Sequence, residues 1–557
     1  MTISSNEKLI PTKKDFWFLP LGGSNEIGMN LNLYGYNKQW LIVDLGVTFF
    51  DRFGVDIITP DPSFLIQHKD NIAGLVLTHA HEDHVGAVPY LWPYLRCPIY
   101  ATPFTMRIVR QKIADKPWKQ DVQLIEIPLS GVFDVGDFKL EYVTLTHSII
   151  EPNALRIETP HGVVLHTGDW KIDPDPMIGE ATDHSRLIEI GNEGVLALVC
   201  DSTNVFNSGV AGSEKAVHDE LMTLMGTFPD SRVTVACFAS NVARLQTIAR
   251  VAAAHGRQVA LVGRSLHRMV AAARDTGYLK GLAPFISDTD AMNLPYHLVC
   301  FIVTGSQGEA RAALARIAET QHPVVKYSEN DVVLFSSRMI PGNEKNISAL
   351  QNRLVHDGVR VITSSEEDIH VSGHPARDEL RQMYEWIRPE VLVPVHGEAR
   401  HLDEHARFGL ECGIEMAVVP ENGSLIQLKK GDSCEIDLID TGRWVYDGNR
   451  MIPMKSPVLK DRFKLSTEGL IVATVIIDHV GRILQTPLLT IKGLCDSSDE
   501  VEVLNREIYM SLSDAFDREF KSNDDRSEVL KAIIRKATHR YLGKKPVVDV
   551  HVIEAEM

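Results

Sequence analysis

The chain has 557 residues, and at about 150 residues per domain this length predicts about three to four domains or one large domain with insertions. Its 44% hydrophobic and 24% charged residues are ordinary for a globular protein and exclude a disordered, collagen-like or coiled-coil chain. With 57 Lys and Arg against 74 Asp and Glu the formal net charge is −17, which excludes a histone-like nucleic-acid coat but leaves room for a local basic groove or a metal site.

The first 14 residues are polar and lack the apolar stretch of a signal peptide. No segment reaches the roughly 18 uninterrupted apolar residues of a membrane span. The seven Cys are scattered and form no CxxC pair, which indicates reduced thiols and neither a disulfide framework nor a Cys-type zinc site. We therefore expect a soluble cytoplasmic protein that does not associate with a membrane.

Short apolar strands recur through the first two hundred residues. Most are rich in β-branched residues and are followed at once by polar residues or Gly. The expected strands are residues 40–47, 72–78, 138–145, 162–167 and 195–200. His79 directly follows one of them, and His147 and Asp169 each follow another after a single residue. Because strand ends release side chains into loops on a rigid scaffold, these three residues are candidates for a functional site.

From about residue 233 the pattern changes to a regular alternation of strands and helices, which predicts a parallel α/β insertion. The expected strands are 232–238, 258–263 and 297–304, and the expected helices are 241–255, 266–273 and 307–318. Further strands are expected at 331–337, 359–364 and 391–396. Residues 448–460, which contain several Pro and Lys, indicate a linker. Beyond it the pattern predicts a small domain with strands at 469–478, 483–491 and 546–553 and helices at 498–520 and 526–541.

Residues 78–84 read Thr-His-Ala-His-Glu-Asp-His and hold a dense set of metal-binding groups. Imidazole and carboxylate are ligands of zinc and similar divalent ions. In an extended loop His79 and His81 point to one side and can bind one metal, and Asp83 and His84 can reach a second metal about 3.5–4 Å away. Chance predicts only roughly 0.002 copies of HxHxDH in such a chain. The spacing also excludes a helical HExxH protease site.

This motif follows an apolar strand and lies downstream of Asp44, which ends the run LIVD, and the combination resembles the metallo-β-lactamase family. His147 in TLTHS and Asp169 in HTGDW match the later motifs of that family. The block from about residue 214 to 375 resembles the β-CASP insertion of metallo-β-lactamase enzymes that act on nucleic acids. Its markers are Asp201 in CDST, His374 in HVSGH and His396 in VPVHGE.

Further matches make nearly the whole chain similar to the bacterial ribonuclease J family. They are GGSNEIG at 22–28, FASN at 238–241 and RMIPGNE at 338–344. The chain departs from the family by carrying Ala80 and Trp170 where Gly and Phe are commoner. Neither side chain would be a ligand, so the departures leave metal binding untouched.

The resemblance implies an α/β fold in several parts. They are a split metallo-β-lactamase αββα sandwich over residues 1–213 and 376–450, a β-CASP α/β insertion over 214–375, a linker over 451–465 and a small α/β C-terminal domain over 466–557. It also implies two divalent metal ions per chain, zinc first and manganese as the alternative, because nitrogen and oxygen ligands accept both. The implied ligands are His79, His81 and His147 for one metal, Asp83, His84 and His396 for the other, and Asp169 between the two.

The implied chemistry is phosphodiester hydrolysis by a metal-activated hydroxide. Asp83 is expected to accept a proton from the water, and His374 to protonate the leaving 3′ oxygen or to stabilise the pentacovalent state. Asp44 and Asp201 are expected to support the ligands from behind. Ser240 and Asn241 lie at a helix start, which predicts both a helix cap and an anion site. The expected phosphate-binding residues are Ser240, Asn241, His370, Val371, Ser372, Gly373 and His374.

We therefore expect a metal-dependent ribonuclease for single-stranded RNA, a 5′-to-3′ exonuclease that prefers 5′-monophosphate ends and has some endonuclease activity. The alternatives are a β-CASP endoribonuclease that matures RNA 3′ ends, a small-molecule hydrolase, which the long insertion disfavours, and an RNA-binding subunit without metals, which the full ligand set disfavours. Arg244, Arg264, Arg268 and Lys345 are candidates for an RNA path, and the alternative for each of them alone is an ordinary surface charge. The final strand, at 546–553, predicts a homodimer or homotetramer, and an RNA-degradation complex is a further expected partner.

Overall fold

The computed structural model describes residues 9–52, 54–479, 483–513 and 523–555. The chain forms two compact units, one of residues 1–49 and 57–443 and the other of residues 50–56 and 444–557. The last part of the helix expected at 498–520 lies outside the described residues. No helix of the described residues is long and apolar enough to span a membrane.

Two sheets pack face to face in the first unit. One has the strand order β22-β21-β1-β2-β3-β6-β7-β8 and the other the order β20-β19-β13-β12-β11-β10-β9. The strands of the first sheet are β1 (Trp17–Gly22), β2 (Leu31–Tyr36), β3 (Gln39–Val43), β6 (Ile72–Val76), β7 (Ile99–Ala101), β8 (Leu124–Glu126), β21 (Ser424–Gln427) and β22 (Cys434–Leu438). Those of the second are β9 (Val132–Val135), β10 (Phe138–Thr144), β11 (Asn153–Thr159), β12 (Gly162–His166), β13 (Ala197–Asp201), β19 (Val391–Val395) and β20 (Met416–Ala417).

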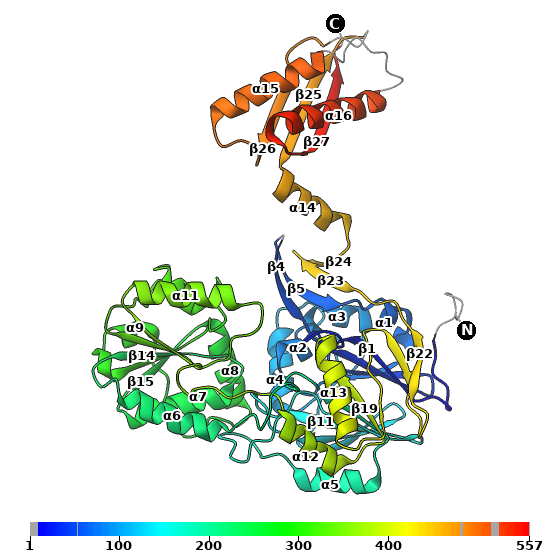
Figure 1. The fold of residues 1–557 in the computed structure, drawn as a ribbon, viewed down its shortest axis with the longest axis vertical. Coiled ribbons are helices and arrows are strands. Elements are labelled where there is room, and N and C mark those ends of the chain that lie inside the picture. The colour runs from blue at the N-terminus through cyan, green and yellow to red at the C-terminus, as the bar shows by residue number, and fades with distance from the viewer. Residues whose placement is uncertain (1–8, 53, 480–482, 514–522, 556–557) are drawn as a thin grey trace. The chain divides into compact units, whose positions relative to one another are not determined.

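Alternating side chains of these strands build the core between the sheets. Leu41 and Val43 of β3 lie in one buried cluster with Leu155 and Ile157 of β11. The helices α5 (His184–Glu193), α12 (Arg377–Ile387) and α13 (Ala399–Glu411) cover the other face of the second sheet (Figure 1). Helix α12 buries Leu380, Met383, Tyr384 and Ile387, the spacing of a single helix face.

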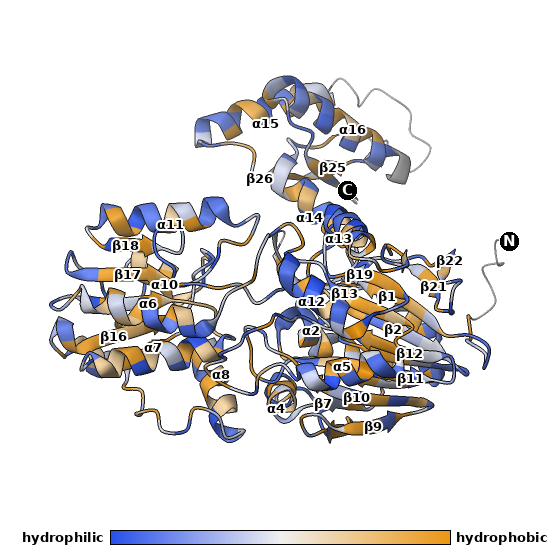
Figure 2. Cartoon of the chain, turned by 60° about the horizontal axis from the view of Figure 1, so that its bottom comes forward, coloured by the Kyte–Doolittle hydropathy of each residue, from blue (hydrophilic) through white to orange (hydrophobic). Residues whose placement is uncertain are grey.

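The first sheet carries α3 (Val88–Leu95) and α4 (Pro103–Lys112), of which α4 contacts β7 and β8. Hydrophobic residues follow the strands of both sheets, while helices such as α5 and α11 carry hydrophilic residues as well (Figure 2). Helices therefore cover both outer faces, and the predicted αββα sandwich is confirmed.

The insertion is a five-stranded parallel sheet with the order β15-β16-β14-β17-β18. Its strands are β14 (Arg232–Ala236), β15 (Gln258–Val262), β16 (Val299–Val303), β17 (Asp331–Phe335) and β18 (Arg360–Thr363), and the helices that accompany them include α6 (Glu214–Gly226), α7 (Val242–Ala254), α8 (Arg264–Asp275), α10 (Ala313–Ala318) and α11 (Glu344–His356). Because the strands are parallel, their carboxyl ends meet at the same edge of the sheet. The predicted parallel α/β insertion is confirmed.

Helix α10 is shorter than the helix predicted at 307–318. Gly308 has φ +73°, and a Cβ there would lie 2.6 Å from the carbonyl carbon of Asn346, so this position belongs to a tight loop. The N–H of Leu314 donates to the carbonyl of Thr304, which folds residues 305–312 back onto the end of β16. The prediction was wrong over this first half because helix-forming Ala and Arg residues there follow the glycine-rich turn.

In the second unit a three-stranded sheet with the order β26-β25-β27 packs against two helices. Its elements are β25 (Leu470–Ile477), β26 (Leu488–Lys492), α15 (Ser498–Ser513), α16 (Asn523–Leu542) and β27 (Val547–Glu554). Within the segment expected to be a linker the structure has helix α14 (Pro457–Glu468). Ser456 caps it by accepting a hydrogen bond from the N–H of Val458, and Pro457 suits the first helical position. The exact domain boundaries stay a prediction.

Candidate metal centre

The seven predicted ligands lie at strand ends of both sheets of the sandwich. The relevant ends are those of β6, β10, β12 and β19, and the short helix α2 (Glu82–Val85) contributes two more side chains. The ligands after β6 and in α2 are His79, His81, Asp83 and His84, and those after the other strands are His147, Asp169 and His396. The structure brings all seven together in two groups that share Asp169.

Three imidazole nitrogens face one another in the first group. His81 Nδ1 lies 3.1 Å from His79 Nε2 and 3.0 Å from His147 Nε2. Asp169 Oδ2 lies 3.8 Å from His79 Nε2 and 3.7 Å from His147 Nε2. The four ligand atoms lie within 4.8 Å of one another, which suits an ion with bonds of about 2.0–2.1 Å to nitrogen.

The second group contains Asp83, His84, Asp169 and His396. His396 Nε2 lies 3.1 Å from Asp83 Oδ2, and His84 Nε2 lies 3.2 Å from Asp169 Oδ1. Asp169 therefore turns one oxygen toward each group. Its Oδ1 is buried and has no hydrogen bond with the described residues. A buried carboxylate oxygen without a donor is costly, and a divalent ion between the two groups would satisfy it.

Hydrogen bonds set the tautomer of four of the five histidines. His79 Nδ1 donates to the Thr78 hydroxyl, His84 Nδ1 to Asp44 Oδ2, and His147 Nδ1 to the carbonyl of Gly373. His396 Nδ1 donates to the hydroxyl of Thr203 at 2.8 Å. Each bond leaves Nε2 as a lone pair aimed into the site, which is how a metal-binding imidazole is usually oriented. The Nε2 lone pairs of His79 and His147 both face His81 Nδ1, and a single ring hydrogen there satisfies only one of them, whereas a cation would satisfy both.

The two groups differ in the charge that they favour. Burial lowers the pKa of His79 and His147, and burial likewise lowers the pKa of His81 to about 4, so all three are neutral near pH 7, the form that binds metal. Burial opposes protonation of His84 and His396 as well, but Asp169 and the other nearby carboxylates raise the pKa of both. The second group therefore attracts positive charge strongly. The donor set fits two divalent ions.

Asp44 supports the HxHxDH loop from behind. It is buried, has φ +64°, and accepts hydrogen bonds from the N–H and the hydroxyl of Thr78, both at 2.8 Å, and from His84 at 2.7 Å. These bonds fit the supporting role expected from the sequence, which stays a prediction: one carboxylate holds both the loop backbone and the ring of a predicted ligand.

Asp201 lies behind the other side of the site. Its Oδ2 accepts a hydrogen bond from His374 Nδ1 at 2.8 Å, and its Oδ1 accepts one from the Thr203 hydroxyl at 2.7 Å. Thr203 in turn accepts the bond from His396. A continuous series of hydrogen bonds therefore connects His396, a predicted ligand, to His374. The sequence analysis missed Thr203, although it lies in the CDST run that contains Asp201.

The turn at 370–374 lies against the sandwich. Asn204 donates to the Ser372 hydroxyl at 2.7 Å and to the carbonyl of His374 at 3.0 Å. A Cβ on Gly373 would lie 2.7 Å from His147 Cε1, so the close approach requires glycine. Half-buried Val371 packs beside Gly212. Sequence reasoning missed Asn204, which also accepts a bond from Arg338 at 3.2 Å.

His370 and Asn241 lie on neighbouring segments. Burial lowers the pKa of His370 to about 3, and its Nδ1 has no hydrogen-bond partner among the described residues. Asn241 caps α7 and donates to Glu214 at 3.1 Å, while Arg244 of α7 donates to the carbonyl of Ile369. The predicted cap is therefore present, but the Asn241 side chain is already bonded. The N–H groups of Asn241, Val242 and Arg244 also donate within the chain, which leaves the half-buried Ser240 hydroxyl for an anion.

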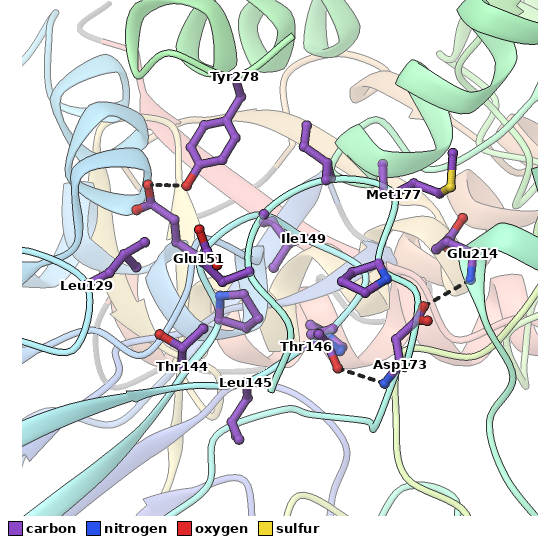
Figure 3. Close-up of a pocket in the computed structure, with 17 residues that line it drawn as sticks. Leu129, Thr144, Leu145, Thr146, Ile149, Glu151, Asp173, Met177, Glu214 and Tyr278 are labelled. Carbon is purple, nitrogen blue, oxygen red and sulfur yellow. Dashed lines mark hydrogen bonds between the residues drawn. The ribbon is translucent and has the colours of Figure 1, made fainter. Parts of the chain in front are cut away.

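A small cavity of about 30 Å³ lies beside His147 and is lined by both the sandwich and the insertion (Figure 3). Glu151 accepts hydrogen bonds from the N–H of Phe104 at 2.8 Å and from the Tyr278 hydroxyl at 3.0 Å. Asp173 accepts one from the N–H of Glu214 at 2.9 Å. These polar contacts connect the loops after β10 and β12 to the insertion.

Family models match most of the chain. Residues 40–191 match the beta-lactamase superfamily domain, 230–354 the ribonuclease J beta-CASP domain, 358–419 the Zn-dependent metallo-hydrolase RNA specificity domain and 457–555 the ribonuclease J C-terminal domain.

Curated relatives match over similar lengths. Ribonuclease J of Sinorhizobium meliloti is 43% identical over 96% of both chains. Ribonuclease J of Helicobacter pylori is 33% identical over 96% of this chain and 78% of the relative, and that of Corynebacterium glutamicum is 36% identical over 94% and 73%. A crystal structure of a protein of unknown function from Enterococcus faecalis V583 has a TM-score of 0.52 at 17% identity, covers 74% of this chain and 100% of its own, and supports the fold alone. By its domains and by its relatives, this chain belongs to the ribonuclease J family.

Proposed function

We propose that this chain is a metal-dependent ribonuclease that degrades single-stranded RNA from the 5′ end, prefers a 5′-monophosphate and also cleaves internally. Membership of the ribonuclease J family supports metal-dependent RNA hydrolysis. The observation that carries the proposal is the pair of donor groups that share Asp169, with His374 directly beside them.

In the proposed ligand assignment His79, His81 and His147 would hold one ion, Asp83, His84 and His396 would hold the other, and Asp169 would contribute to both groups. Two zinc ions suit this mainly imidazole donor set, and manganese is the alternative. When bound, the ions supply positive charge and lower the pKa of a coordinated water.

The chain's own groups handle the protons. Asp83 Oδ2 belongs to the second donor group and lies beside His84 and His396. It is placed to accept the proton of the attacking water. Burial opposes the protonated form of His374, but the charge of Asp201 and its hydrogen bond raise the pKa of His374. Because Nδ1 donates to Asp201, the proton available for the leaving 3′ oxygen is on Nε2.

The segments after β14 and β18 form the proposed pocket for a terminal phosphate. Its groups are Ser240, Asn241 and the turn from His370 to His374. A site with these few donors suits a monophosphate better than a triphosphate, and phosphate binding there would assist cleavage at the metals.

We further propose the domain boundaries given above, a cytoplasmic location, and a homodimer or homotetramer that enters an RNA-degradation complex. These proposals rest on the family and on the exposed apolar side chains of the second unit, among them Leu488.

The decisive experiment is digestion of one RNA sequence with either a 5′-monophosphate or a 5′-triphosphate, with product sizes read over time. The proposal expects mononucleotides from the monophosphate and much slower release from the triphosphate. A His374→Ala variant and added chelator are the controls, and both should abolish cleavage. Equal rates on both ends with internal products would favour the β-CASP endonuclease instead, and digestion from the 3′ end would contradict the polarity.

A further inference from the structure

A second cavity, of about 600 Å³, opens in the insertion at the carboxyl ends of β15 and β16. Ligand sites in proteins commonly have about 300–1,000 Å³. Val262 and Gly263 line it from β15, and Thr304 from β16. None of the seven proposed metal ligands lines it, so it is separate from the metal centre. In open parallel sheets this edge is where ligands bind.

Glycine makes this edge compact. Gly263 has φ +138°, and a Cβ there would lie 2.6 Å from the hydroxyl oxygen of Thr304. Any larger residue would push the ends of β15 and β16 apart. Gly263 is also the N-cap of α8. Because it has no side chain, the first turn of α8 starts directly at the cavity with its cap position open.

The lining is rich in arginine. Arg264, Arg268, Arg311 and Arg316 face two carboxylates, Asp288 and Glu309. Within the described part of the chain, Arg264 and Arg268 form no ion pair and no side-chain hydrogen bond. Two other arginines of the insertion are neutralised by buried ion pairs: Arg232 pairs with Asp331 and Arg244 with Glu214. The cavity therefore holds an excess of positive charge in a chain whose net charge is −17.

His322 adds a neutral donor to this wall. Its Nδ1 accepts hydrogen bonds from the N–H groups of Val324 at 3.3 Å and Val325 at 3.0 Å, so the ring hydrogen is on Nε2. Burial and the charge of Arg316 lower the pKa of His322, against the opposite effect of Asp288. Guanidinium groups and a neutral N–H donor are the combination that binds phosphate oxygens.

The cavity also lies at the edge of the insertion's sheet from which loops extend toward the metal centre. The loops that follow β14, β17 and β18 leave the same edge of the parallel sheet and carry Ser240, Arg338 and the turn at 370–374. Helix α8, which lines the cavity, packs against α4 of the sandwich: Arg107 pairs with Asp275 at 2.7 Å, and Gln111 donates to the carbonyl of Arg268.

We infer that this cavity is a second phosphate-binding site, which holds backbone phosphates of the RNA strand that leads to the metal centre, or the phosphate of a free nucleotide. The inference rests on the proposed ribonuclease function for its RNA source. The binding of a phosphate by Arg264, Arg268 and the start of α8 is inferred from the cavity and its positive charge alone.

The test is the double variant Arg264→Gln with Arg268→Gln in the full-length chain. Long 5′-monophosphorylated RNA should show a KM raised about tenfold with kcat unchanged, because the variant loses two charged contacts to phosphate while the neighbouring groups keep part of the binding. A 5′-monophosphorylated dinucleotide, too short to reach the cavity, should be cleaved as by the parent. The slope of log binding constant against log salt should fall by about 1.4 for two lost phosphates.

Arg250→Gln, an exposed arginine of α7 outside the cavity, is the matched control, and Arg264→Lys with Arg268→Lys should keep the salt slope. Calorimetric titration with AMP and ADP separates the two sources. If the Gln variant binds RNA more weakly, the RNA strand is the source of the bound phosphate. If it binds only AMP or ADP more weakly, the source is a free nucleotide. Parent-like RNA and nucleotide binding in the folded Gln variant overturns the site. If the parent binds RNA but cleaves none, the proposed function fails while the salt slope still tests the cavity.

Discussion

Asp169 belongs to every group of metal-binding atoms in the described chain. Its Oδ2 faces His79 and His147, and its Oδ1 faces His84. Because one carboxylate serves both groups, its removal should affect both ions, whereas removal of a histidine in the first group should affect mainly one.

We therefore predict that Asp169→Asn loses both metals and that His81→Ala loses about one, with cleavage abolished in both and the fold retained. Elemental analysis of the purified variants measures this, beside circular dichroism for the fold. His356→Ala is the control, because that side chain is 82% exposed on α11. Unchanged metal content in His81→Ala would refute the ligand assignment.

Thr203 acts on the site through His396 and Asp201. Thr203→Val removes the hydroxyl that fixes His396 Nδ1, and it should reduce metal affinity or kcat about 10–100-fold, as is usual for groups behind a ligand. Thr203→Ser keeps the hydroxyl and should restore most of both values. Metal affinity by chelator competition and kcat are the readouts, and a Val variant with parent-like values would contradict the role.

The spacing of HxHxDH was enough to predict which side chains meet, because a strand end followed by a short helix leaves few arrangements. It could not predict which nitrogen binds, since Nδ1 of His147 is fixed by Gly373, which lies 226 residues away in the sequence. Thr203 and Asn204 were missed for the same reason. Their roles depend on partners in the insertion and after β19, which no local pattern reveals.

At the scale of elements, sequence periodicity located twelve of the fourteen expected strands to within two residues, but it did not predict other strands, among them β1, β2 and β11. It failed where tertiary contacts decide the structure. The loop before α10 is held by Gly308 and Thr304, and α14 starts at a Ser–Pro pair inside a segment that reads as a linker. Helices and linkers have similar amino-acid compositions in such segments. Tertiary contacts, and not the composition, therefore decide whether a helix forms there.

Helices α6 and α7 are joined by a buried ion pair between Glu214 and Arg244. Burial alone would raise the pKa of Glu214, but the charge of Arg244 and its hydrogen bonds lower it below the usual 4.5. The pair therefore stabilises the folded chain above about pH 4.5, and this contribution is lost as the pH falls through the lowered pKa.

Arg244→Met should leave the Glu214 carboxylate buried without its cationic partner, with only the hydrogen bond from Asn241 remaining among the described residues, and destabilise the insertion by about 3–5 kcal/mol near pH 7. The difference from the parent should shrink at acid pH, where Glu214 is neutral in the variant. Hydrogen exchange of the α7 amides at about pH 7 and about pH 5 measures this locally. Arg250→Met on the exposed side of α7 is the control, and equal protection in both variants would show that the pair contributes nothing.

At the scale of the molecule the two units have separate cores. In the second unit the helices cover one face of the sheet, where Ile471, Ala473 and Val475 are buried. The alternate residues of β25 are only half-buried, and on the strands beside it Leu488 is 71% and Ile553 49% exposed. A sheet with one open, partly apolar face and the edge strands β26 and β27 favours association with another copy.

We predict that Leu488→Lys combined with Ile553→Lys in the full-length chain weakens self-association, because two charges would be placed in the apolar part of that face. Light scattering should show a lower mass than for the parent at equal concentration, while the melting of the second unit changes little, since neither side chain lies in its core. Val503→Lys, on a 39% exposed position of α15, is the control on the helical side. If the double variant keeps the parent's mass and the control has a reduced mass, the interface lies on the helical side. If the parent chain is itself a monomer, the prediction of self-association is wrong.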